Sequence, residues 1–228
     1  MRSRRQRGTA NRLLYLAYAI LILTIIPACS SDELTDPPPQ TYTETYLTNQ
    51  GWLFFRAGDF DQALAQFQQA LTQDPGFSPA LVGRGWTQLR TAESRPGLVD
   101  ALNSFLAAIA LEETDNDVYS GQACVRLALG GIELAGASTD ARRVIDSDPD
   151  YQFEHWTEFD VNSLYLIKAF AAAGQGDYEQ AVASVQDIYP NILEVGSPLT
   201  WVVQGVQYGD FISAACALLQ YVGGLADS

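Results

Sequence analysis

The sequence repeats itself at an interval of 34 residues, and this periodicity limits the folds that the chain can adopt. Gly51-Trp52 recurs as Gly85-Trp86. A period of this size indicates supersecondary units that bury their apolar faces only by stacking on neighbouring units. Apolar residues at helical spacing follow each pair, first as Ala63, Phe67 and Ala70 and then as Ala101, Phe105 and Ala108. We therefore expect a stack of helix pairs.

Residues 44–77 resemble one complete tetratricopeptide repeat. The matching positions are the small Gly51, the aromatic Phe54, the turn Gly58-Asp59-Phe60 and the closing Asp74-Pro75. Helices that pack closely need a small residue where they cross, so we expect Gly51 to lie against Ala63. Pro75 cannot continue a helix, which is why the unit closes there.

Three further units, at 78–113, 114–151 and 162–195, keep parts of this pattern. The second unit is expected to have a longer internal turn, running through residues 94–97. The resemblance to the tetratricopeptide family covers residues 42–195 and implies an all-α fold, a right-handed α-solenoid of about four helix-turn-helix repeats. An amphipathic helix from Asp210 to Val222, in region 196–228, is expected to cap the stack.

An extra segment, Gln152–Val161, separates the third unit from the fourth and is rich in aromatic and acidic residues. It contains the only histidine of the chain, His155, which has no other histidine or cysteine near it at metal-ligand spacing. The pattern is typical of an approach to a helix or of a loop that faces a partner. The sequence leaves open which of these the segment is.

The N-terminus has the features of a secretory signal peptide. Five arginines and no acidic residue flank an apolar run from Leu13 to Ile26, which is shorter than the roughly 20 residues of a membrane-spanning helix. Ile26-Pro27-Ala28-Cys29 then resembles the bacterial lipobox, although Pro27 departs from its usual pattern. The resemblance implies removal of residues 1–28 and acylation of Cys29, palmitate being one such acyl chain. The alternatives are ordinary cleavage after Ala28 and an uncleaved anchor.

Residues 29–41 are acidic and proline-rich, which is typical of an extended tether. Five of the 13 basic residues precede Cys29, so eight remain against 27 acidic ones, a net charge of −19. Such a surface disfavours nucleic acids and anionic headgroups, so the membrane is expected to be reached through the lipid alone. Ser30 after the cysteine favours the outer membrane of the cell envelope by analogy with enteric sorting. The periplasmic and surface faces both stay open.

No pattern in the sequence indicates catalysis, a cofactor or a metal site. There is no glycine-rich phosphate loop or nucleophile elbow. Acidic residues at 112–117 lack the glycine and closing glutamate of a calcium loop. Cys124 and Cys216 are either small buried hydrophobes or, in an oxidising compartment, a disulfide. We therefore expect a protein that is not an enzyme.

The tetratricopeptide resemblance implies a concave groove lined by the first helix of each repeat. The residues expected to bind a partner there are Trp52, Phe55, Arg56, Trp86, Arg90, Arg126 and Phe170. Aromatic residues and arginine often anchor partners, and arginine can hold a carboxylate or a phosphate through two parallel hydrogen bonds. The alternative is that Trp52 and Trp86 pack between repeats while the arginines pair with acidic side chains.

Two functions fit this sequence. The first is a non-catalytic protein–protein interaction scaffold, anchored to the bacterial envelope, that binds a protein or peptide partner there. The alternative is an envelope lipoprotein that binds a small molecule or a glycan, with Trp52, Trp86 and Trp156 as stacking platforms. The oligomeric state is not predicted.

Overall fold

The computed structural model describes residues 42–226, apart from residues 191 and 195. The chain divides into one unit at residues 1–41 and a compact unit from residue 42 onward. The predicted signal peptide, Cys29 as the predicted site of lipidation, and the predicted tether therefore lie outside the described residues. Among the described helices, none combines the length and the apolar character needed to cross a bilayer.

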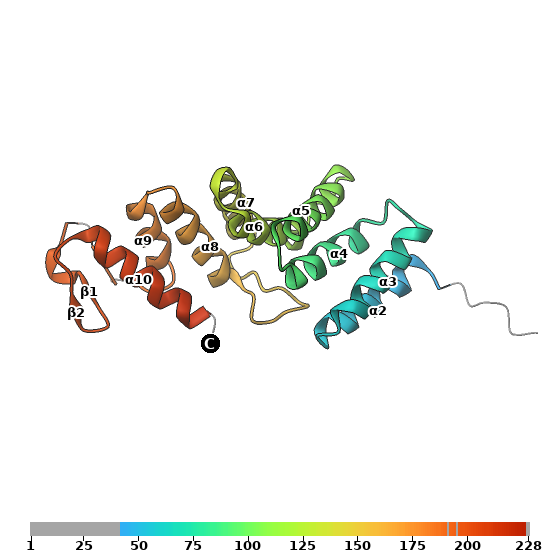
Figure 1. Ribbon diagram of the computed structural model, residues 1–228, viewed down its shortest axis with the longest axis horizontal. Coiled ribbons are helices and arrows are strands. Elements are labelled where there is room, and N and C mark those ends of the chain that lie inside the picture. The colour runs from blue at the N-terminus through green and yellow to red at the C-terminus, as the bar shows by residue number, and fades with distance from the viewer. Residues whose placement is uncertain (1–41, 191, 195, 227–228) are drawn as a thin grey trace, which may run out of the picture. The chain divides into compact units, whose positions relative to one another are not determined.

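Eight helices of the described part form four consecutive pairs (Figure 1). The pairs are α2 (Glu44–Arg56) with α3 (Phe60–Gln73), α4 (Ser78–Thr91) with α5 (Arg95–Ala110), α6 (Asn116–Leu129) with α7 (Leu134–Ser147), and α8 (Val161–Gly174) with α9 (Tyr178–Gln186). Each of these helices packs on the one before it, including α8 on α7 although a segment without helix separates them. The first helices of neighbouring pairs also contact one another. A short 3₁₀ helix, η1 (Gly131–Glu133), leads into α7. This nearest-neighbour stacking is the arrangement of a helical-repeat solenoid.

The turn inside the first pair is repeated inside the fourth. Gly58 and Gly176 have φ angles of 77° and 83°, a left-handed conformation that glycine adopts without steric cost. The next residues, Asp59 and Asp177, cap α3 and α9 by accepting a hydrogen bond from a backbone amide three residues on. The similar Gly-Asp-aromatic sequences therefore build the same helix–turn–helix connection.

The glycines Gly51 of α2 and Gly85 of α4 lie against a phenylalanine ring of the following helix. A Cβ atom on Gly51 would lie 2.7 Å from the Phe67 ring, and one on Gly85 would lie 2.8 Å from the Phe105 ring. Both rings are fully buried. The Phe67 ring is therefore the nearest neighbour of Gly51 at this helix crossing, and the expected position of Gly51 against Ala63 stays a prediction.

The long internal turn expected in the second unit is replaced by a longer helix. Helix α5 begins at Arg95 and has 16 residues, against 14 in α3. Pro96 lies in its first turn, where the missing N–H would have no partner within the helix. The residues expected at 94–97 as loop therefore mostly belong to α5.

The C-terminal region contains a hairpin that the sequence analysis did not predict. A 3₁₀ helix, η2 (Pro198–Thr200), precedes the antiparallel strands β1 (Val202–Val203) and β2 (Val206–Gln207). Gln204 and Gly205 join the strands, both with positive φ. Helix α10 (Phe211–Ala226) follows, extends beyond the expected Val222, and packs on α8 and α9.

Candidate functional site

Residues 151–160, called the inserted segment below, connect α7 to α8 and extend toward α4 (Figure 1). The segment closes on itself at its base. The Phe153 amide donates to the Phe159 carbonyl at 3.0 Å, and the Val161 amide donates to the Tyr151 carbonyl at 2.8 Å. Its side chains are thereby presented to the first helices of the first two pairs.

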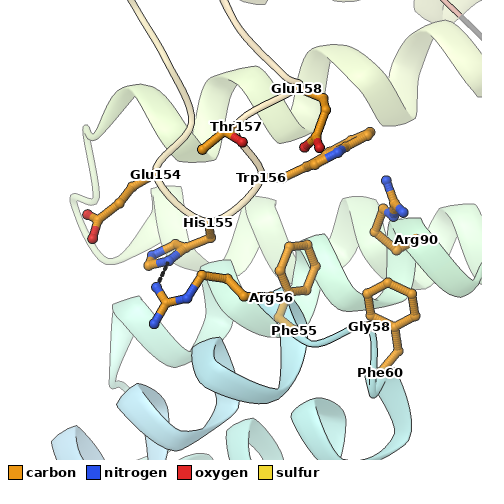
Figure 2. Close-up of a pocket in the computed structure, with 10 residues that line it drawn as sticks. All are labelled: Phe55, Arg56, Gly58, Phe60, Arg90, Glu154, His155, Trp156, Thr157 and Glu158. Atoms are coloured by element: carbon orange, nitrogen blue, oxygen red, sulfur yellow. Dashed lines mark hydrogen bonds between the residues drawn. The ribbon is translucent and has the colours of Figure 1, made fainter. Parts of the chain in front are cut away.

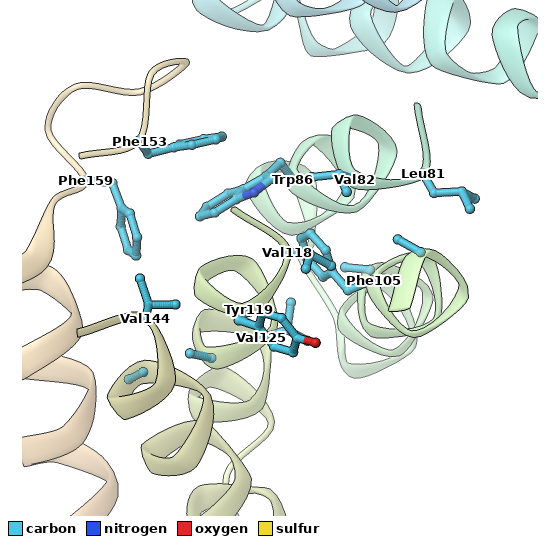
Figure 3. Packing of buried hydrophobic residues seen from close by; sticks show 14 of the residues in the cluster. Leu81, Val82, Trp86, Phe105, Val118, Tyr119, Val125, Val144, Phe153 and Phe159 are labelled. Atoms are coloured by element: carbon cyan, nitrogen blue, oxygen red, sulfur yellow. The ribbon is translucent and has the colours of Figure 1, made fainter. Parts of the chain in front are cut away.

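The inserted segment covers the aromatic residues of α2 and α4. Phe153 is fully buried and stacks on Trp86 with ring centroids 4.3 Å apart. It also meets Trp52 and Phe55 edge to face, at 5.9 and 6.4 Å. Figure 3 shows Phe153 and Phe159 reaching from the segment to the Trp86 indole. The groove of the first two pairs is therefore filled by the chain itself.

This packing corrects the expectation of an open aromatic stripe. Trp86 is 0% exposed, Phe55 4% and Trp52 8%. These exposed fractions match the alternative in which the tryptophans pack in the interior. The side chains are buried because the inserted segment, whose position the sequence left open, covers them. Partner binding by these three residues stays a prediction, and it would require the segment to move.

A buried polar cluster fixes the start of the inserted segment. The Trp86 indole N–H donates to the Asp117 carbonyl at 3.0 Å, while the Tyr151 hydroxyl donates to the Asp117 carboxylate at 2.8 Å. The same hydroxyl lies 2.8 Å from the Ser120 hydroxyl. Burial raises the pKa of Asp117 to about 6, with smaller contributions from nearby acidic residues, although the hydrogen bond from Tyr151 opposes this shift.

This raised pKa predicts that acid stabilises the fold through Asp117. A group with a folded-state pKa of about 6 and an ordinary value of 3.8 contributes stability that is complete below pH 3.8. That contribution is lost as the pH rises through about 6. Relative to Asp117→Asn, the wild-type protein should therefore lose free energy of unfolding between pH 4 and pH 7.

Urea unfolding of both proteins across this pH range measures the difference. Burial also raises the pKa of Asp140 to about 6. Because Asp140 titrates in both proteins, its effect on the free energy of unfolding cancels when the two are compared. His155, whose pKa is lowered instead of raised, is also present in both proteins, so its effect cancels as well. A difference that stays constant with pH would show that Asp117 does not titrate in this range.

A pocket of about 390 Å³ lies where the turn after α2, the end of α4 and the inserted segment meet. Figure 2 shows the Arg90 guanidinium between the rings of Trp156 and Phe60. Its central carbon is 4.0 Å from the Trp156 centroid and 5.5 Å from the Phe60 centroid. Cation–π attraction to both rings holds the guanidinium in place.

Arg56 also lines the pocket and is held by His155. Its guanidinium donates to Nδ1 of His155 at 3.1 Å, and the imidazole stacks on Trp52 with centroids 3.8 Å apart. Burial lowers the pKa of His155, and the charge of Arg56 lowers it further, against an opposing effect of Glu154. The imidazole is therefore neutral at pH 7 and serves as the acceptor of this hydrogen bond.

Tetratricopeptide-repeat models match two parts of the chain, residues 45–77 and 163–186. These segments are therefore similar to tetratricopeptide repeats. They correspond to α2–α3 and to α8–α9, the two pairs joined by a Gly-Asp-aromatic turn. Proteins built on this repeat are generally non-catalytic and bind proteins or peptides.

Solved structures of tetratricopeptide-repeat proteins share the fold. MamA is 18% identical, with a TM-score of 0.52 over 81% of this chain and 87% of its own. TTC0263, a thermophilic protein of Thermus thermophilus, is 21% identical, with a TM-score of 0.51 over 80% and 84%. YrrB, described as having an unusual peptide-binding site, is 18% identical, with a TM-score of 0.52 over 79% and 88%. No curated protein matches the sequence. The predicted all-α solenoid of helical repeats is confirmed.

The two remaining predicted site residues, Arg126 and Phe170, do not line this pocket. Arg126, on α6, pairs with Asp140 at 3.0 Å and with Glu133 at 3.5 Å. Phe170, on α8, is half-buried in the C-terminal core, close to Gly223 of α10. The predicted arginine row is therefore divided, because Arg126 is neutralised by its own repeat while Arg56 and Arg90 are not.

Several pocket residues were not predicted from the repeats. Phe60 belongs to the helix turn, while His155 and Trp156 belong to the inserted segment. The aromatic and acidic composition of that segment was a signal, but its position on α2 and α4 was not readable from it. Cys124 and Cys216 are both free thiols, and the described residues contain no group of three potential ligands that could hold a metal ion.

Proposed function

We propose that the protein is a non-catalytic interaction module that binds a protein or peptide partner and is anchored in the bacterial envelope by a lipid on Cys29. The observation that carries the proposal is that α2 and α4 already hold a non-helical stretch of chain, the inserted segment, through aromatic stacking. Beside that segment an open pocket presents Arg56 and Arg90. The peptide-binding site of YrrB, a protein of similar fold, supports the same kind of ligand.

The surroundings of the only histidine support a binding role over a catalytic one. His155 is stacked on Trp52 and hydrogen-bonded to Arg56, so it forms part of the pocket wall. A general base needs a reacting group within hydrogen-bond reach and a supporting acceptor. The described residues place no serine, cysteine or carboxylate in a hydrogen bond with this ring.

Burial of the tryptophans weakens the alternative of a glycan or small-molecule site. Two of the three expected platforms, Trp52 and Trp86, are covered by the inserted segment. Trp156 lines the pocket, but one of its faces is already occupied by Arg90. A sugar ring would find little free aromatic surface in this part of the structure.

Photo-cross-linking in intact cells tests the binding role. A photoreactive residue would replace Thr157, which is exposed and lines the pocket, or Thr139, which is equally exposed but lies on α7. We expect a discrete cross-linked band with an envelope protein from position 157 and none from position 139. Identical bands from both positions, or none from either, would contradict a partner site at the pocket.

Metabolic labelling with an alkyne-tagged palmitate tests the anchor. We expect the wild-type chain to be labelled and to sediment with the outer-membrane fraction, and a Cys29→Ser chain to be unlabelled and released from it. Labelling that survives this substitution would contradict lipidation at Cys29. A labelled chain in the inner-membrane fraction would contradict the proposed location only.

A further inference from the structure

Among the described residues, Arg90 and Arg56 form no ion pair although the chain is strongly acidic. The sequence contains 27 acidic and 13 basic residues. Within the described part of the chain, ion pairs of 4.0 Å or less involve only Arg126 and Lys168 as cations. Glu154 and Glu158 line the same pocket, yet neither forms an ion pair with either arginine. Other described arginines also lack a carboxylate partner, so Arg56 and Arg90 are distinguished by their place, because both line a pocket.

The geometry at Arg90 prepares the guanidinium for a ligand. The central carbon of the guanidinium lies over the rings of Trp156 and Phe60, at 4.0 and 5.5 Å from their centroids, and aromatic carbons accept no conventional hydrogen bonds from its N–H groups. Figure 2 shows the group between the two rings. A planar guanidinium that is fixed in this way loses less conformational freedom when it forms two parallel hydrogen bonds.

We propose that this pocket binds a carboxylate of an acidic segment of a partner protein, with Arg90 as the residue that holds it. The inference rests on the proposed binding function and specifies the chemistry of the partner. Arg56, on the other side of Phe55, adds a second positive charge to the rim. Trp156, and with it one wall of the site, comes from the inserted segment, so the specificity is not a property of the repeats alone.

The other charges of the pocket favour a carboxylate over a phosphate. Glu154 and Glu158 contribute two negative charges that offset the two arginines. With the pocket charges balanced in this way, the net negative charge of the whole chain repels a phosphate group, which carries nearly two charges at pH 7, more strongly than a singly charged carboxylate. The net charge of the whole chain repels anions in general, so any preference for an acidic peptide must arise locally.

Selection from a displayed library of random heptapeptides, applied to the full chain in detergent, tests this proposal. Arg90→Met keeps the aliphatic stem that packs between the rings but removes the charge. Arg142→Met is the matched control, because Arg142 is exposed on α7 and the substitution changes the net charge equally. Arg90→Lys keeps the charge but loses the planar fork. Thermal melting of each variant verifies that it folds.

We expect peptides selected by the wild-type protein and by Arg142→Met to be enriched in aspartate and glutamate. The best of them should bind Arg90→Met about tenfold or more weakly, since hydrogen bonds to charged groups are the strong ones. Arg90→Lys should fall between the two. Equal acidic content in peptides selected by wild type and by Arg90→Met, or enrichment of phosphopeptides over acidic peptides in a matched library, would overturn the proposal.

The outcome is separable from that of the proposed function. If a partner cross-links at position 157 but Arg90→Met leaves that band unchanged, the binding role stands and the carboxylate site is wrong. If Arg90→Met abolishes both the band and the acidic preference while the protein stays folded, both are supported.

Discussion

Replacing Trp86 with alanine is expected to lower the free energy of unfolding by roughly 3–5 kcal/mol, the usual cost of removing a buried tryptophan. The indole is fully buried, stacks on Phe153 and donates a hydrogen bond to the Asp117 carbonyl. Its loss therefore creates a cavity and also leaves a buried acceptor without its donor. For a chain of this size we expect the melting temperature to fall by about 10 °C.

Trp156→Ala is the matched control for this prediction. Trp156 is only half-buried and contacts Phe159 and the exposed Arg90. We expect a loss below about 1.5 kcal/mol, within the range of an exposed cation–π contact and partial burial. Equal destabilisation by the two substitutions, measured by urea unfolding, would contradict the difference in burial.

Replacing Phe153 with alanine is expected to release the inserted segment from the groove. The ring is fully buried against Trp86, Trp52 and Phe55, so its loss should also cost roughly 3–5 kcal/mol. Unlike the loss of Trp86, it should act first on residues 151–160, because it removes their main contact with α2 and α4. Trp52 and Trp86 would then become accessible to water.

Hydrogen exchange and tryptophan fluorescence measure this release. In Phe153→Ala we expect faster exchange of the Phe159 and Val161 amides and a red-shifted emission. Phe211→Ala, which alters the C-terminal core, should leave the exchange of these two amides near that of the wild type; it is a control for exchange only, because Phe211 contacts Trp201. Unchanged exchange at residues 151–161 in Phe153→Ala would mean that this ring does not hold the segment.

The repeats were predictable because their signals are local. The interval between Gly51 and Gly85 and the Gly58-Asp59-Phe60 turn arise within single helix pairs, where sequence spacing and structure correspond directly. The hairpin after α9 was missed because its turn, Gln204-Gly205, lacks the Asn-Gly or Asp-Gly pair that marks such turns. The predicted length of the turn between α4 and α5 was wrong, because a proline in the first turn of a helix looks the same in sequence as a proline in a loop.

The candidate site was predictable only in part, because it joins distant parts of the chain. Arg56 and Arg90 were predicted from their place in the repeat, and both line the pocket. The contacts that surround these arginines were not predictable, because they come from the inserted segment. Phe153 of that segment, which covers Trp86, lies 67 residues further along the chain than Trp86. The inserted segment has no counterpart in the repeat pattern, so that pattern could not predict which residues the segment contacts.

The measurement that tests the account most directly is a nuclear Overhauser experiment on the full chain in detergent micelles, with protonated phenylalanine and tryptophan rings in a deuterated background. Ring centroids 4.3 Å apart predict strong cross-peaks between Phe153 and the Trp86 indole, assigned by loss in Phe153→Ala. Such cross-peaks would place the inserted segment on the first two repeats. Their absence, with Phe153 shifts near those of an unstructured peptide, would contradict the filled groove and the pocket that depends on it.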